Sequence, residues 1–248
     1  MRKFLYAVFM LIMMFLSTCK SANWTNVAGG ELAILASSNS PFPHPQRATG
    51  HFNRDSLYSF EEHYNDSSVA IFIFPEGPRN APDSFGGRLE EKDVFKALVE
   101  DVLTFLKHEK RIADDVPGRI ILSGHSGAYR VISYILNRGG LTENISEVYL
   151  FDALYAQIEN YTHWVEKHGG KLVNITTPNG GTNSNSVELV EDLNDWGIAN
   201  LRIGGNEVSA EDLSATRITS VFTTLGHSEV IDPYFQICLS ASGLKKSE

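Results

Sequence analysis

From residue 69 onward the chain alternates between two hydrophobic patterns. Short, uninterrupted apolar runs are typical of buried strands, and the segments between them repeat apolar residues every three or four positions, as one face of a helix does. Strands are predicted over 69–74, 120–122, 147–151, 171–176 and 217–223, and helices over 94–106, 129–137, 158–168, 187–196 and 233–239. Strands that alternate with helices along the chain predict an α/β fold, a three-layer α/β/α sandwich with a mostly parallel sheet.

The first 66 residues follow neither pattern. Arg2 and Lys3 precede an apolar run over 4–16, which is too short for the ~20 residues that span a bilayer and is typical of a secretory signal. Three prolines between residues 41 and 45 then exclude regular ladder structure. We therefore expect a signal peptide over 1–18, an irregular arm over 19–66 with one candidate strand over 31–36, and one α/β domain over 67–248.

The end of the signal segment carries a candidate lipidation site. Leu16-Ser17-Thr18-Cys19 resembles the lipobox of bacterial lipoproteins, although Thr18 departs from its preferred small residue. This resemblance implies a periplasmic or cell-envelope lipoprotein that meets the membrane only through a lipid on Cys19. Conventional cleavage nearby, giving a secreted protein, is the alternative. Either way Cys238 loses its only disulfide partner, and we expect it to be a buried apolar side chain in the last helix.

Composition narrows the classes of partner. The 248 residues carry a formal net charge of -9, which argues against nucleic acid as the main partner. His44, His51 and His63 in the arm have carboxylates nearby and could bind metal, but their spacing matches no known ligand pattern. We expect no cofactor, and nothing in the sequence indicates the oligomeric state.

The strongest chemical signal is the strand-to-helix junction over 119–130. Gly124 and Ala128 lie two residues to either side of Ser126, the nucleophile-elbow pattern in which small neighbours let a strand and a helix pass closely around an exposed serine. Here the chain resembles the α/β-hydrolase superfamily, and Ser126 matches its nucleophile. The alternative is a glycine-rich turn with an incidental serine.

The resemblance implies an acid and a base that follow the serine in chain order. His227 comes directly after the last predicted strand and is the expected base. Asp152 ends the strand over 147–151 and is the expected acid, a less common position in the superfamily; the commoner loop, over 178–186, contains no carboxylate. Glu188 and Asp192 are the reserves, and a turn-capping role for Asp152 is the alternative.

The resemblance also implies two oxyanion donors. The amide of Gly127 is the first. Gly77 or Arg79, after the strand over 69–74, could supply the second only if that strand is central in the sheet. With one convincing strand ahead of the elbow strand, either the arm supplies the missing strands or the fold is shortened before the nucleophile.

Together these residues predict an exported serine hydrolase that cleaves an ester or amide of a small-molecule, lipid or peptide substrate through an acyl-enzyme on Ser126. The alternative is a non-catalytic lipoprotein that keeps the fold as a binding scaffold, and an acyltransferase would use the same residues. Phe85, Tyr129, Tyr155 and Trp164 could line a substrate pocket, although aromatic residues at these spacings more often belong to a core.

Overall fold

The computed structural model of the protein describes residues 30–37, 71–73, 75, 84–110 and 112–244, with only the backbone for 30–37 and 72. The predicted signal segment, the candidate lipidation site at Cys19, and the proposed oxyanion residues Gly77 and Arg79 lie outside these ranges, as does most of the predicted arm.

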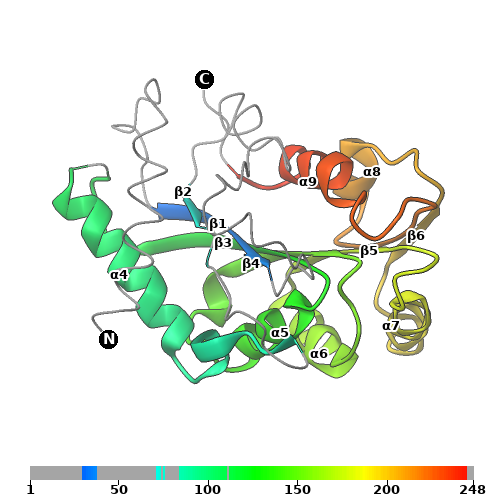
Figure 1. The fold of residues 1–248 in the computed structure, drawn as a ribbon, viewed down its shortest axis with the longest axis horizontal. Helices are drawn as coiled ribbons and strands as arrows, with labels where there is room; N and C mark the ends of the chain where they lie inside the picture. The colour runs from blue at the N-terminus through cyan, green and yellow to red at the C-terminus, as the bar shows by residue number, and fades with distance from the viewer. Residues whose placement is uncertain (1–29, 38–70, 74, 76–83, 111, 245–248) are drawn as a thin grey trace, which may run out of the picture.

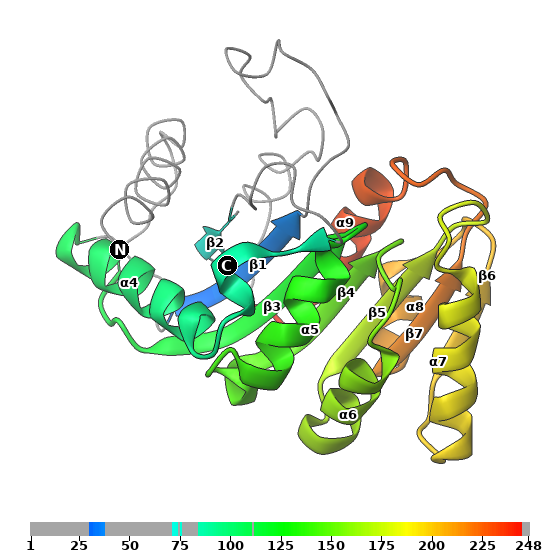
Figure 2. The ribbon, with the colours of Figure 1, turned by 60° about the horizontal axis from the view of Figure 1, so that its bottom comes forward.

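The described strands form one sheet of seven, in the order β2-β1-β3-β4-β5-β7-β6. Every neighbouring pair is parallel. The strands are β1 (Gly30–Ser37), β2 (Ile71–Ile73), β3 (Pro117–His125), β4 (Ile145–Phe151), β5 (Lys171–Thr176), β6 (Leu201–Gly204) and β7 (Ile218–Phe222). Because all run the same way, their carboxyl ends share one edge of the sheet, where ligands bind in open α/β sheets (Figure 2).

Helices cover both faces of this sheet, which gives the three-layer α/β/α sandwich that the sequence predicts (Figure 1). One face carries α4 (Val94–His108), α5 (Ala128–Arg138), α6 (Ile158–His168) and α7 (Asn183–Asp195), and the other carries α8 (Ala210–Ala215) and α9 (Ile231–Ser240). Two short 3-10 turns, η4 (Gly87–Glu90) and η5 (Thr142–Asn144), complete the described elements. No helix in the described ranges has both the length and the apolar character that a membrane crossing requires.

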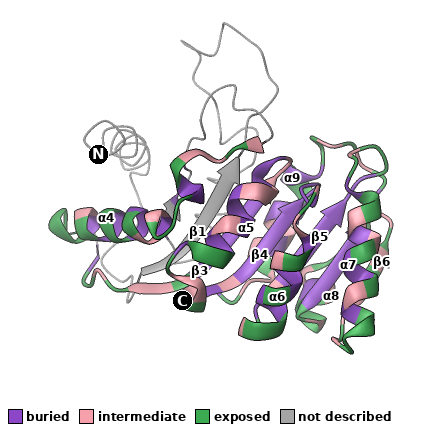
Figure 3. Ribbon diagram, turned by 90° about the horizontal axis from the view of Figure 1, so that it is seen from below, coloured by how far each residue is buried: buried purple, intermediate pink, exposed green. Residues whose placement is uncertain are grey.

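Residues of the central strands are buried on both faces of the sheet. In β3, Ile120 and Leu122 pack into the core beneath α4 and α5, whereas Ile121 packs into the second core beneath α8 and α9. In β4, Leu150 packs into the core beneath α4 and α5, and Tyr149 packs into the second core. Figure 3 shows β4 and β5 buried along their length and the sheet-facing sides of the helices buried against them. This two-sided burial explains why the strands read as apolar runs without alternation.

The largest difference from the predicted organisation concerns β1. The candidate strand over 31–36 is confirmed as β1, but it does not belong to an irregular arm, because it lies inside the sheet between β2 and β3. Leu32 pairs with Ile71 on one side and with Ile120 on the other. The arm therefore supplies a strand ahead of the elbow strand, and β2 is left at one end of the strand order.

Two helices begin earlier than the sequence predicts. The helix predicted from residue 187 is α7, which begins at Asn183, and the Asn185 amide in its first turn donates 3.0 Å to the Leu154 carbonyl. The helix predicted from residue 233 is α9, which begins at Ile231 with Val230 as its N-cap, because both residues are buried in the core beneath α9. Cys238 is a free thiol buried in α9, as predicted.

Candidate active site

The turn after β3 has the geometry of a strained elbow. Ser126 has φ 57°, in the left-handed region, and its amide donates 3.3 Å to the Phe151 carbonyl of the next strand. For a residue with a side chain this conformation costs roughly 1–3 kcal/mol. Gly124 lies in the middle of the sheet, paired with residues of β1 and β4, and the fully buried Ala128 begins α5. A larger residue at Ala128 would enter a packed layer.

The amide of Gly127 is a hydrogen-bond donor at the N-terminus of α5. Gly127 is the N-cap residue of α5, and its N–H takes part in no hydrogen bond among the described residues. The first amides of a helix have no partner within the helix, and its dipole favours negative charge there. A negative charge that develops on an oxygen bound next to Ser126 would meet this donor one residue away.

Asp152 lies at the carboxyl end of β4, next to β3, and is fully buried. Its φ of 45° turns the chain away from the strand, while its amide donates 2.7 Å to Ile175 of β5. Three neighbours donate to the carboxylate. The Thr177 amide and hydroxyl donate at 3.2 and 2.6 Å, the Thr182 hydroxyl donates to the oxygen that accepts from the Thr177 amide, and His227 Nδ1 donates at 2.6 Å.

These hydrogen bonds keep the buried carboxylate charged. Burial alone raises the pKa of Asp152, but the hydrogen bonds from His227, Thr177 and Thr182 outweigh it and bring the pKa below its ordinary value. Gly180 closes the site from the β5–α7 loop, since a Cβ there would lie 1.6 Å from Asp152 Oδ2. The carboxylate is therefore held from every side and is ionised at neutral pH.

His227 lies in the loop between β7 and α9 and its side chain is 31% exposed. The Asp152 carboxylate can only accept, so Nδ1 of His227 carries the proton and Nε2 of the neutral ring keeps its lone pair. That is the tautomer a general base requires. The loop around it is closed by Glu229, whose carboxylate accepts from the Gly226 amide at 2.7 Å and whose amide donates back to Gly226.

His125, the last residue of β3, reaches the same loop. Its Nε2 lies 2.8 Å from the backbone carbonyl of His227, and the two rings are 4.4 Å apart between centroids. Burial lowers the pKa of His125 to about 4, so the ring is neutral at physiological pH.

The Ser126 hydroxyl has a different neighbour from the one expected. Within the described part of the chain, no hydrogen bond joins Ser126 and His227. Tyr155, three residues after Asp152, lies near enough to Ser126 for the serine side chain to lower the tyrosine's pKa. Burial first, and then the charge of Asp152, raise the pKa of Tyr155 by more, so the phenol is protonated at neutral pH. The ring packs 5.8 Å from Tyr129 and against Gly181.

The remaining predicted residues do not join this cluster. Glu188 is exposed on α7 and Asp192 is half-buried there, and the Nδ1 of His227 is taken by Asp152. Trp164 is buried in the core beneath α6, and Phe85 lies 40% exposed under Arg130. Of the four aromatic residues predicted as possible pocket residues, only Tyr155 and Tyr129 lie beside the serine.

The position of β1 also bears on the second oxyanion donor. Gly77 and Arg79 follow β2, which is separated from β3 by β1, so the strand that precedes them is not central. The condition under which they could donate is therefore not met. The strand that reaches the elbow is β1, whose last residue, Ser37, is paired with His125.

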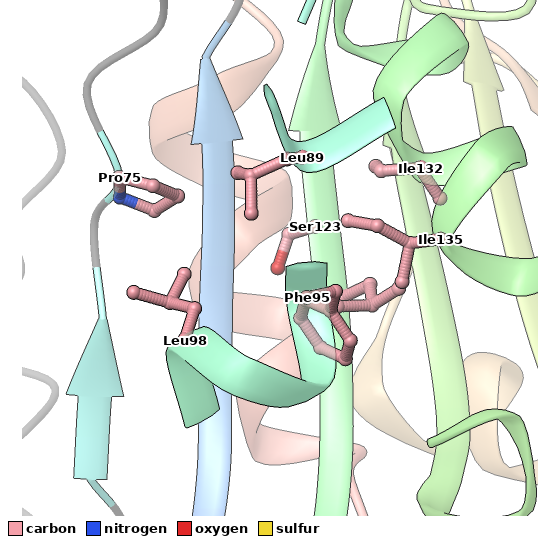
Figure 4. Close-up of a pocket in the computed structure, with 8 residues that line it drawn as sticks. Pro75, Leu89, Phe95, Leu98, Ser123, Ile132 and Ile135 are labelled. Carbon is pink, nitrogen blue, oxygen red and sulfur yellow. The ribbon is translucent and has the colours of Figure 1, made fainter. Parts of the chain in front are cut away.

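A small pocket beneath β3 takes no part in this chemistry (Figure 4). It is bounded by side chains from η4, α4, α5 and β3 that are almost all apolar, and it has no room for a water molecule. The close-up shows Leu89, Phe95, Leu98 and Ile135 around it, with the Ser123 hydroxyl directed inward. It is a gap in core packing. Nor do the described residues contain a cluster of His, Cys, Asp and Glu that could hold a metal ion; His44, His51 and His63 lie outside them.

The partners of Asp152 could not be found from the sequence. Thr177, Thr182 and Gly180 belong to the β5–α7 loop, whose most visible feature in the sequence is that it contains no carboxylate. The adjacent threonines at the end of β5 are the one signal that points to a polar, buried strand end. The arrangement joins an ionised carboxylate to an imidazole that it orients, and His125, directly before the strained Ser126, contacts the loop that carries this imidazole.

Comparison with known proteins adds little to this geometry. No family model matches the chain, and no curated protein matches it. Among solved structures, an uncharacterized protein from Bacillus cereus ATCC 10987 aligns with a TM-score of 0.46 and 10% sequence identity. The alignment covers 90% of this chain and 65% of that one.

Proposed function

We propose that the protein is a serine hydrolase of the α/β-hydrolase type that cleaves an ester or amide through an acyl-enzyme on Ser126. The observation that carries the proposal is the 2.6 Å hydrogen bond between His227 Nδ1 and the buried carboxylate of Asp152. Three of the four donors to Asp152 belong to the β5–α7 loop, whereas the fourth is the side chain of His227. A buried carboxylate that fixes an imidazole is the pairing that nucleophilic catalysis by a serine uses.

In the proposed reaction the Ser126 hydroxyl adds to the carbonyl carbon of the substrate while Nε2 of His227 takes the hydroxyl proton. Asp152 stabilises the imidazolium that forms, and the free amide of Gly127 donates to the oxyanion. The imidazolium then gives its proton to the leaving alcohol or amine as the bond breaks. Water repeats the two proton transfers and releases the acid, which restores Ser126.

The test is covalent labelling of Ser126 with a fluorophosphonate probe. We expect labelling of the folded wild-type protein, none of Ser126→Ala, and strongly slowed labelling of Asp152→Asn, in which His227 loses the acceptor that fixes its tautomer. Near-identical thermal unfolding of Ser126→Ala and wild type would show that the loss is chemical. A folded wild type that is not labelled contradicts the proposal.

One observation favours the alternative, a non-catalytic binding protein with the same fold. The described residues show no hydrogen bond between Ser126 and His227, and Tyr155 lies near the serine instead. Catalytic hydrogen bonds are often long without substrate, which is why we rank hydrolysis first. Short- and long-chain p-nitrophenyl esters and aminopeptide substrates separate the two, since a binding protein turns over none of them.

For the cellular location we propose export with a lipid on Cys19, supported by the charged, apolar and lipobox-like succession over 2–19. A single acyl chain binds membranes only marginally, and bacterial lipoproteins overcome this with several chains. Detergent partitioning of wild type and Cys19→Ala tests the proposal. Equal partitioning of both into the aqueous phase would favour a secreted protein.

A further inference from the structure

We propose that His125 is a positioning residue that holds the candidate base, His227, against the nucleophile turn through a hydrogen bond to its backbone carbonyl. The inference rests on the proposed function, because it concerns how the base is placed for reaction. It assigns a role to the residue directly before the nucleophile, which the serine, histidine and aspartate alone do not require.

The direction of this hydrogen bond is fixed by chemistry. A carbonyl oxygen only accepts, so the 2.8 Å contact requires a proton on Nε2 of His125. The charged and titratable groups that face His125 are His227, from the β7–α9 loop, and Asp152, from the end of β4. The side chain is partly buried between these elements, and burial keeps its ring neutral. One tautomer is therefore present, with its donor aimed at the loop.

His227 then has two anchors with different tasks. Asp152 binds the ring at Nδ1, which sets its tautomer and orientation, and His125 binds the backbone at the carbonyl, which sets its place. The two imidazole rings also pack at 4.4 Å, tilted by 37°. A base on a half-exposed loop needs both, because fixing the ring alone leaves the loop free to carry it away from the serine.

The hydrogen bond that holds the His227 loop comes from the last residue of β3, the strand that leads into the nucleophile turn. His125 and Ser126 are joined by one peptide bond, so any shift of the turn moves the His227 loop with it. The spacing between base and nucleophile is thereby set by β3, the third strand in the order of the sheet, rather than by the β7–α9 loop. A misplacement of about 1 Å between reacting groups can cost 10²-fold in rate.

The test uses three substitutions of His125. Glutamine places an N–H donor at the reach of Nε2, asparagine carries the same amide one carbon shorter, and phenylalanine keeps a ring without a donor. On whichever ester the wild type turns over, we expect His125→Asn and His125→Phe to lower kcat by roughly 10- to 100-fold with KM unchanged. We expect His125→Gln to restore most of the rate. Thermal unfolding checks that each variant is folded.

Proton NMR of the His227 Nδ1–H provides a readout that a purely structural role would not move. Its downfield signal should persist in His125→Gln and broaden by faster exchange in His125→Asn and His125→Phe. Wild-type kcat in folded His125→Asn overturns the inference, and so does equal loss in the Gln and Asn variants, which would make the ring the important part. A wild type that neither reacts with the fluorophosphonate nor turns over substrate is a different result and overturns the proposed function.

Discussion

Gly180 gives the sharpest test of how the candidate acid is held. A Cβ built on this residue would lie 1.6 Å from Oδ2 and 2.3 Å from Cγ of Asp152, distances that no real Cβ shows. The backbone of Gly180 is not in the left-handed region, so the Gly180→Ala change acts through this clash and not through backbone strain. Either the carboxylate or the β5–α7 loop must move.

The size of the effect follows from the partners of the carboxylate. Reaching even 3.0 Å from the new methyl group requires a shift of about 1.4 Å, more than a hydrogen bond of 2.6 to 3.2 Å tolerates. Hydrogen bonds to charged groups contribute about 1.5–3 kcal/mol each, and a buried charge that loses partners is costly. Losing two of the four corresponds to about 3–5 kcal/mol in the free energy of unfolding. Misorienting His227 lowers kcat by about 10² to 10⁴.

Urea unfolding and fluorophosphonate labelling measure the two effects, the latter at a low temperature at which both proteins remain folded. Gly204→Ala is the matched control, because Gly204 ends β6 with no heavy atom within 4 Å of the position that its new methyl group would take, and with no left-handed backbone. We expect Gly204→Ala to stay within about 0.5 kcal/mol of wild type. A Gly180→Ala protein that matches wild type in both assays would refute the close packing of this loop on Asp152.

Further predictions concern the serine and its two neighbours. Tyr155→Phe removes the hydroxyl beside Ser126 and should lower kcat about tenfold, whereas Tyr134→Phe, on the far part of α5, should not. Ser126→Gly should unfold with a free energy about 1 kcal/mol above that of Ser126→Ala, because only alanine keeps the left-handed strain; equal denaturation midpoints would argue against that strain. Burial lowers the pKa of His125 from 6.5 to about 4, so the unfolded chain binds the proton first as pH falls. The free energy of unfolding should therefore drop by up to about 3 kcal/mol between pH 7 and 4, and this dependence should be weaker in His125→Phe.

Much of the fold could be predicted because its strands are apolar on both faces and its helices are amphipathic. β3, β4 and β5 are buried between two helical layers, and this leaves a continuous apolar run in the sequence. β6 and α8 were not predicted, since β6 is four residues long with no fully buried position and α8 buries only Leu213. Such short, half-exposed elements are set by the sheet they join rather than by their own pattern.

The sequence predicts the main residues of the candidate site but not the contacts between them. Ser126 could be proposed from the small residues around it, and the positions of Asp152 and His227 follow from the order of strands in the resembled superfamily, because parallel strands bring their carboxyl ends together. The contacts of Thr177, Gly180 and Tyr155 with these residues depend on how separate loops meet, which no local pattern records.

The placement of β1 has a consequence for how the chain folds. Leu32 pairs with Ile120, so the strand order β2-β1-β3 closes only after a long stretch of chain has been made, and such distant pairings slow folding. A fragment beginning at residue 67 would leave β3, the strand that carries the nucleophile, with an open edge on that side. Unpaired N–H and C=O groups on an apolar central strand invite pairing with another chain. We therefore expect a soluble protein to require the residues from Gly30 onward.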